Sequence, residues 1–137
     1  MEKIRQIGAT RVEIKEEGYT RIEISSEWGN EISVKEAEEV CQAIYDLNNG
    51  QPYGAIVVGT NAAGMRMESG VNKVFASNPL IDKIRIAEAQ VFNSLSQRLM
   101  IHVYHKMSRK KNFKVFKEEK EAKKWILERI QEEAFKP

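Results

Sequence analysis

A glycine-spaced loop is a segment of this chain whose residue types could do chemistry. It reads GTNAAGMRMESG, residues 59–70, and follows the apolar run of residues 55–58. A loop that leaves a buried strand and opens a helix is where many α/β proteins bind phosphate, because backbone N–H groups there point at the ligand. The pattern therefore raises the question of a nucleotide site.

The residues that follow the glycines argue against such a site. Gly59 and Gly64 have the spacing of the glycines in G-x-x-x-x-G-K-[ST], but Met65 and Arg66 stand where the lysine and the magnesium-binding hydroxyl belong. The G-x-G-x-x-G pattern of dinucleotide-binding proteins is also absent. We therefore expect no cofactor, and interpret the small residues as allowing close packing or a positive φ. Arg66 could still bind an anion, so an enzyme acting on a phosphorylated substrate remains a third alternative.

The histidines and the cysteine do not form an evident catalytic or metal-binding set. His102 and His105 lie three residues apart on a predicted helix, a spacing that can bring both imidazoles to one metal ion, but no third ligand is evident. Cys41 lies among apolar residues at helical spacing, which predicts a buried structural thiol. We therefore predict neither a metal site nor acyl-transfer chemistry.

One short basic run is a candidate anion patch. It comprises Arg109, Lys110 and Lys111, with Tyr104 and Phe113 nearby. Cations beside aromatic rings can bind phosphates and stack a base. However, the net charge of the chain is only +2, and a solvated turn that neutralises a helix C-terminus explains the run better. Nucleic acid is therefore not an expected partner.

The elements that position these groups follow from apolar periodicity. Residues 11–24 alternate apolar with polar on both sides of a glycine turn, which predicts a β-hairpin. Ser33, with Glu36 three residues on, has the spacing of a capping box and predicts a helix that ends at Asn48-Asn49-Gly50. The apolar run of residues 53–58 has no polar alternation, so we predict a central strand covered on both faces.

The second half continues the alternation of helices and strands. Helices are predicted over residues 67–76, 94–107 and about 118–134, and strands over residues 83–92 and 113–116. Trp125 is the predicted anchor of the last helix.

One predicted strand carries an unusual polar pair. If residues 83–92 alternate regularly, Arg85 lies on one face, and Glu88 and Gln90 interrupt an apolar face on the other. We expect these two side chains at an edge or on a less covered face of the sheet. A protein contact or the lining of a small pocket is the alternative for them.

Length and composition indicate a single α/β domain over residues 1–137. The chain is 42% hydrophobic and 31% charged, and no segment approaches the roughly 20 apolar residues of a membrane span. The first ten residues lack the apolar part of a secretory signal, so we expect a cytoplasmic protein. Residues 1–50 carry six Lys/Arg against eleven Asp/Glu, a net of −5, which leaves +7 for the rest. This asymmetry could favour a homo-oligomer, although solubility alone accounts for it.

The end of the chain resembles a known family. Residues 113–126 read FKVFKEEKEAKKWI. This ending, with the order of elements, resembles the small single-domain STAS-like (SpoIIAA-like) bacterial proteins, which are related in shape to anti-sigma-factor antagonists. In those proteins a closing strand ending in Leu-Phe or Val-Phe is followed by an acidic turn and Ala-x-x-Trp-Leu or a near variant. The resemblance covers about residues 32–130 and implies a mixed sheet of about five strands flanked by about four helices.

The resemblance also implies a candidate phosphoacceptor. The antagonist subfamily carries Asp-Ser-x-Gly at the start of the helix after the central strand, and its serine is phosphorylated. The nearest match here is Glu68-Ser69-Gly70, one residue short. Ser69 is therefore either a phosphoacceptor or only a small residue beside a glycine.

For function, the resemblance favours a non-enzymatic module that regulates another, unidentified protein. The expected contact region is the loop of residues 60–69, with Thr60, Asn61, Arg66, Glu68 and Ser69 as candidate contact residues. The alternative is a carrier of hydrophobic or anionic small ligands, because some STAS-like folds relate in shape to lipid-transfer domains.

Overall fold

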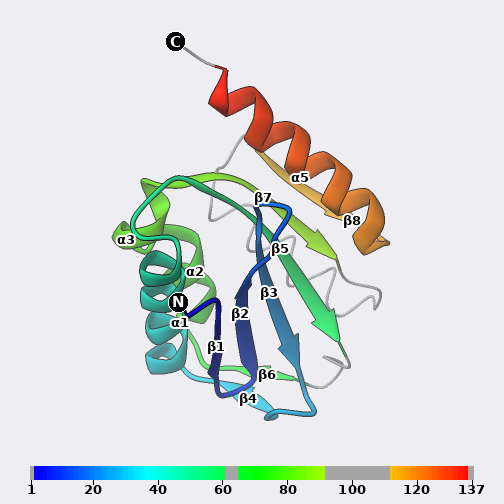
Figure 1. Ribbon diagram of the computed structural model, residues 1–137. Helices are drawn as coiled ribbons and strands as arrows, with labels where there is room; N and C mark the ends of the chain where they lie inside the picture. The colour runs from blue at the N-terminus through cyan, green and yellow to red at the C-terminus, as the bar shows by residue number, and fades with distance from the viewer. Residues whose placement is uncertain (1, 61–64, 92–111, 136–137) are drawn as a thin grey trace.

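The structure, a computed structural model, describes residues 2–60, 65–91 and 112–135. Its main element is a six-stranded mixed sheet with the order β1-β2-β3-β5-β7-β8 (Figure 1). The strands are β1 (Ile4–Ile7), β2 (Thr10–Ile14), β3 (Thr20–Ser25), β5 (Tyr53–Thr60), β7 (Arg85–Val91) and β8 (Phe113–Phe116). The α/β class and the central place of β5 are confirmed.

The N-terminal part of the sheet is a three-stranded antiparallel meander. β2 and β3 form the predicted hairpin, and β1 pairs with β2. β1 was not predicted, because its two isoleucines are separated by two polar residues and so do not alternate. This strand makes the sheet six-stranded rather than about five-stranded.

The other strands run parallel to β3, and the described connections from β3 to β5 and from β5 to β7 contain helices. α1 (Val34–Leu47) connects β3 to β5, and its N-cap Ser33 accepts a hydrogen bond from the Glu36 N–H at 3.1 Å, as predicted. The helix ends where Asn49 and Gly50 adopt positive φ values of 54° and 69°. β3, β5, β7 and β8 are therefore neighbours in the order of the chain.

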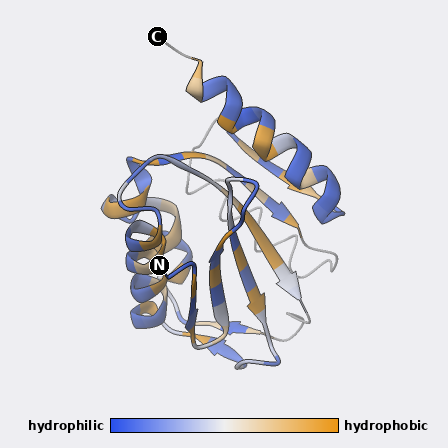
Figure 2. Ribbon diagram, in the orientation of Figure 1, coloured by the Kyte–Doolittle hydropathy of each residue, from blue (hydrophilic) through white to orange (hydrophobic). Residues whose placement is uncertain are grey.

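Helices cover both faces of the sheet. α1, α2 (Val71–Ser77) and α3 (Pro79–Asp82) lie on one face, and α5 (Glu119–Ala134) lies on the other (Figures 1 and 2). Tyr53 and Ala55 of β5 belong to the core beneath α1, whereas Ile56 and Val58 belong to the core beneath α5. β5 is thus buried on both sides, which explains its continuous apolar sequence.

The predicted helix over residues 67–76 begins later than expected. A short second sheet intervenes, in which β4 (Glu31–Ile32) pairs in parallel with β6 (Arg66–Met67). Gly70 has a φ of 98°, a conformation that favours glycine, and α2 starts at the next residue. Met67 is therefore in a strand rather than in a helix.

β7 contains an irregularity that the predicted alternation of residues 83–92 did not include. Tyr53 pairs with Arg85, but Gly54 pairs with Ala87, so Ile86 is an extra residue in β7. The bulge reverses the side on which the first residue of β7 lies. Arg85 consequently shares a face with Glu88, and the prediction that placed them on opposite faces is wrong.

The last helix is anchored by a different residue than predicted. Ile126 and Ala122 are 0% exposed, whereas Trp125 is half-buried and packs at the flank against Phe116, with ring centroids 5.8 Å apart. The predicted helix over residues 94–107, with His102 and His105, lies outside the described residues. No described helix is long and apolar enough to cross a membrane.

Candidate functional site

Three of the candidate contact residues come together around β6. We call the group of Glu31, Arg66, Glu68 and Ser69 the β6 surface. Arg66 N–H donates to the Asn30 carbonyl and Glu68 N–H donates to the Ile32 carbonyl, both at 2.9 Å. The side chains of Arg66 and Glu31 are 72% and 52% exposed, and the closest approach of their charged groups is 4.0 Å. The backbone is therefore fixed while the charged ends remain in solvent.

A buried apolar layer supports this surface. Ile32 of β4 and Val71 of α2 are both 0% exposed and belong to one core cluster with Ile24 and Ala37. Met67, which alternates with the exposed Arg66 and Glu68, packs against this cluster. The alternation of side chains along β6 thus places one side chain inward and its two neighbours outward.

Ser69 occupies the turn that joins β6 to α2. It is exposed, and the left-handed conformation of Gly70 directs the chain from the strand into the helix. The Val71 N–H donates to the Glu68 carbonyl at 3.2 Å and closes this turn. The hydroxyl group of Ser69 is thus accessible to a modifying enzyme or a partner.

The other predicted contact and anion-binding residues are not part of the β6 surface. Thr60 ends β5 and is a hydrogen-bond partner of Glu23 in β3, so it belongs to the opposite face of the main sheet from α1. Asn61 lies outside the described residues, as do Arg109, Lys110 and Lys111.

A second group of polar side chains is buried in the core between β7 and α2. Glu88 and Gln90 are each 6% exposed, and the Gln90 amide donates to the Glu88 carboxylate at 2.7 Å. The Arg85 Nε lies 3.8 Å from Glu88 Oε1, and its Nη2 donates to the Phe75 carbonyl of α2 at 2.6 Å. The expectation that Glu88 and Gln90 lie on a less covered face is wrong, because β7 is internal and its face is covered.

The ionisable groups next to this cluster are held neutral. Burial raises the pKa of the Cys41 thiol to about 12 and that of the Tyr53 hydroxyl to about 12, although Arg85 partly opposes both shifts. Cys41 is buried, as predicted, and its thiol stays protonated at neutral pH. It therefore lacks the thiolate that a nucleophile requires.

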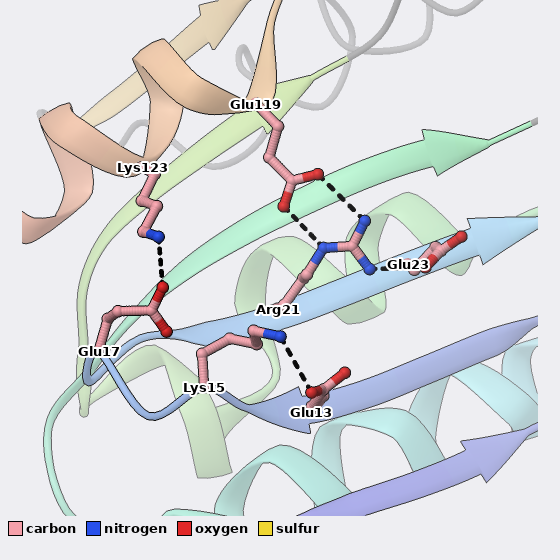
Figure 3. Close-up of polar contacts among 7 residues, drawn as sticks. All are labelled: Glu13, Lys15, Glu17, Arg21, Glu23, Glu119 and Lys123. Atoms are coloured by element: carbon pink, nitrogen blue, oxygen red, sulfur yellow. Dashed lines mark hydrogen bonds and ion pairs between the residues drawn. The ribbon is translucent and has the colours of Figure 1, made fainter.

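A third group forms an ion-pair network on the sheet face that carries α5 (Figure 3). Arg21 of β3 donates to both Glu119 oxygens, at 2.7 and 3.1 Å, and to Glu23 at 2.6 Å. Lys123 pairs with Glu17 of the β2–β3 turn. Each of the three guanidinium nitrogens of Arg21 thus binds a carboxylate, and the pairs join the first turns of α5 to the hairpin.

Two carboxylates of this network, Glu23 and Glu17, are stabilised in their charged form. Burial alone would raise the pKa of Glu23, but hydrogen bonds from Arg21 and Thr60 outweigh it and lower that pKa below 4.5. A hydrogen bond from Lys123 lowers the pKa of Glu17 below the same value. No local pattern in the sequence indicates this network, because Arg21 and Glu119 are 98 positions apart.

Two further observations bear on function. Among the described residues, no group of three histidine, cysteine or acidic side chains could hold a metal ion. No protein-family profile, curated protein or solved structure was found to match the chain.

Proposed function

We propose that the protein is a regulatory interaction module of STAS type that binds another protein through the β6 surface without catalysing a reaction. The observation that carries this proposal is the rigid display of Arg66 and Glu68. Their backbone is paired with β4, and their side chains are exposed. The buried apolar cluster that contains Ile32 and Val71 lies directly beneath them. Charged groups held in a fixed geometry at the surface are suited to selecting one partner by charge complementarity.

Ser69 gives this surface a means of regulation. A phosphate on its exposed hydroxyl would add nearly two negative charges close to Glu68, and would make a surface that already has two acids and one base more strongly negative. By the resemblance drawn from the sequence, Ser69 is the nearest match to the serine that the antagonists carry at the start of the helix after the central strand. We expect phosphorylation to weaken binding of a partner that is itself acidic at the contact.

The test is affinity capture from the source organism with matched variants. Tagged wild-type protein is compared with Arg66→Glu and with the control Lys120→Glu, which makes the same charge reversal at an exposed position of α5. We expect one stoichiometric partner with the wild type and the control, and its loss with Arg66→Glu. Circular dichroism establishes that all three are folded.

Two results would contradict the proposal. Equal recovery of the partner by Arg66→Glu and the wild type would show that the β6 surface is not the contact. Copurification of a small ligand, without any partner that responds to Arg66→Glu, would favour the carrier instead. Comparison of Ser69→Asp with Ser69→Ala then tests the regulatory step, since only the aspartate adds charge.

A further inference from the structure

The contact between α5 and the sheet is narrow for a helix of its length. Of its sixteen residues only Ala122 and Ile126 are buried. Trp125, Leu127 and Ile130 are half-buried, and residues 131–135 are all exposed, with Phe135 at 78%. Figure 1 shows the C-terminal end of the helix extending beyond the sheet. Few apolar contacts must therefore break for α5 to separate from the sheet.

The surface that receives α5 is nevertheless specific in shape. We call this surface the α5 seat; it is formed by Gly54, Ile56, Val58, Ala87 and Ala89. A Cβ atom at Gly54 would lie 2.7 Å from Ile130 and 3.1 Å from Ile126. The absence of a side chain there lets the helix approach closely, so the seat fits a helix with this pattern of side chains.

The seat is also specific in charge. Beside it, Arg21 binds Glu119 with two hydrogen bonds, and Glu17 pairs with Lys123 (Figure 3). The two pairs have opposite polarity: the first has its cation on the sheet side and the second on the helix. A helix that satisfies both must carry an acid and, four residues later, a base, as α5 does.

The connection from β8 to α5 is short, and its side chains make no capping bond to the helix. Lys117 and Glu118 alone join β8 to α5, and both are exposed. The N-cap Glu118 has an extended backbone, with φ −127° and ψ 140°, and makes no side-chain capping bond. A change of conformation at these two residues would redirect the whole helix without breaking a side-chain capping bond.

From these four observations we propose that α5 is exchanged between two copies of this chain, so that each helix occupies the seat of the other copy. The second copy is the occupant that fits, because its α5 restores the shape match at Gly54 and both ion pairs. Only the two connecting residues change conformation, which is the low-cost route to a dimer. Salt weakens the partly exposed ion pairs and therefore accelerates the exchange.

Complementary charge reversal provides a direct test. Arg21→Glu places a second carboxylate against Glu119, and Glu119→Arg places a second guanidinium against Arg21, so each variant mismatches its own helix. In a mixture, exchange of α5 between the two variants restores an acid–base pair at both seats. We expect mixed dimers at about tenfold the dimer fraction of either variant alone, which corresponds to about 1.4 kcal/mol. Native mass spectrometry distinguishes the mixed dimers by mass.

The double variant Arg21→Glu/Glu119→Arg is the matched control. It restores the pair within one chain, and we expect the same dimer fraction as in the wild type. If Arg21→Glu does not fold, Glu17→Lys and Lys123→Glu repeat the design at the more exposed pair. A mixture of folded variants that yields no mixed dimers, before or after incubation at high salt and return to low salt, would overturn the proposal.

Discussion

Arg85 and Glu88 form an ion pair in the core of the domain, with Nε and Oε1 3.8 Å apart and only 3% and 8% of their side-chain surface exposed. The pair exists because the bulge at Ile86 turns Arg85 to the face of Glu88. Arg85 also reaches the Phe75 carbonyl and thereby links β7 to α2. Charged groups at such depth are retained only where they are paired and hydrogen-bonded.

Loss of the Glu88 carboxylate should be strongly destabilising. Glu88→Ala leaves the Arg85 charge buried without this partner, and we expect the free energy of unfolding to fall by about 3–5 kcal/mol. Urea unfolding followed by circular dichroism measures the change. The double variant Arg85→Met/Glu88→Ala, which removes both charges, should lose less than the sum of the losses in Arg85→Met and Glu88→Ala. Additive losses would contradict a direct interaction.

Gly54→Ala tests the close approach of α5. The added methyl group would lie 2.7 Å from Ile130, so we expect a loss of about 1–3 kcal/mol from overpacking. Gly29→Ala is the control, because its methyl group would meet Ala9 at an ordinary 3.5 Å. Thermal unfolding compares the two, and a second substitution, Ile130→Ala, should recover part of the loss in Gly54→Ala. Equal stability of both alanine variants would argue against the described seat.

Ile126 and Trp125 of α5 should contribute differently to the free energy of unfolding. Ile126 is 0% exposed, so Ile126→Ala is expected to cost about 2–5 kcal/mol. Trp125 is only half-buried, so Trp125→Ala should lower the free energy of unfolding by less than the same substitution of a fully buried tryptophan would. Denaturant titration of both variants gives the order, and a larger loss for Trp125→Ala would restore the anchor predicted from sequence.

Acid should weaken the ion-pair network beside α5, in which Glu17 pairs with Lys123 of the helix and Glu23 with Arg21 of β3. The pKa values of Glu17 and Glu23 are lowered in the folded protein, so their pairing stabilises the fold above the ordinary value of 4.5 and is lost as the pH falls through the lowered values. We expect the free energy of unfolding to decline below about pH 4.5. Hydrogen exchange at low pH should show the amides of α5 losing protection before those of β5. In Glu23→Gln the decline should be shallower.

Most of the main sheet could be predicted because its elements have simple periods. The alternation in β2 and β3, the apolar run of β5 and the Ser33 cap each identify an element directly. The bulge in β7 could not be predicted, since the sequence around Ile86 contains no glycine or proline to mark it. β4 and β6 are also too short to show a period, as each has two residues.

The candidate site was predictable in part for the same reasons. Arg66, Glu68 and Ser69 stood out by residue type, but their common surface depends on pairing with Glu31, 35 positions away. Glu88 and Gln90 were visible as polar residues on an apolar strand, whereas the pairing of Glu88 with Arg85 depends on the bulge. Local patterns therefore identified the residues, and long-range pairing determined which of them meet.

The pairing of β4 with β6 closes a loop of chain that contains all of α1 and β5, through the bonds from Arg66 to Asn30 and from Glu68 to Ile32. A ligand that binds Arg66 therefore acts on Asn30, three residues before the Ser33 cap of α1, and one that binds Glu68 acts on Ile32, the residue just before that cap. Ordering of this β4–β6 pair would reach the first turn of that helix, whose Ala37 shares a core cluster with Ala9 and Ile24 of the meander.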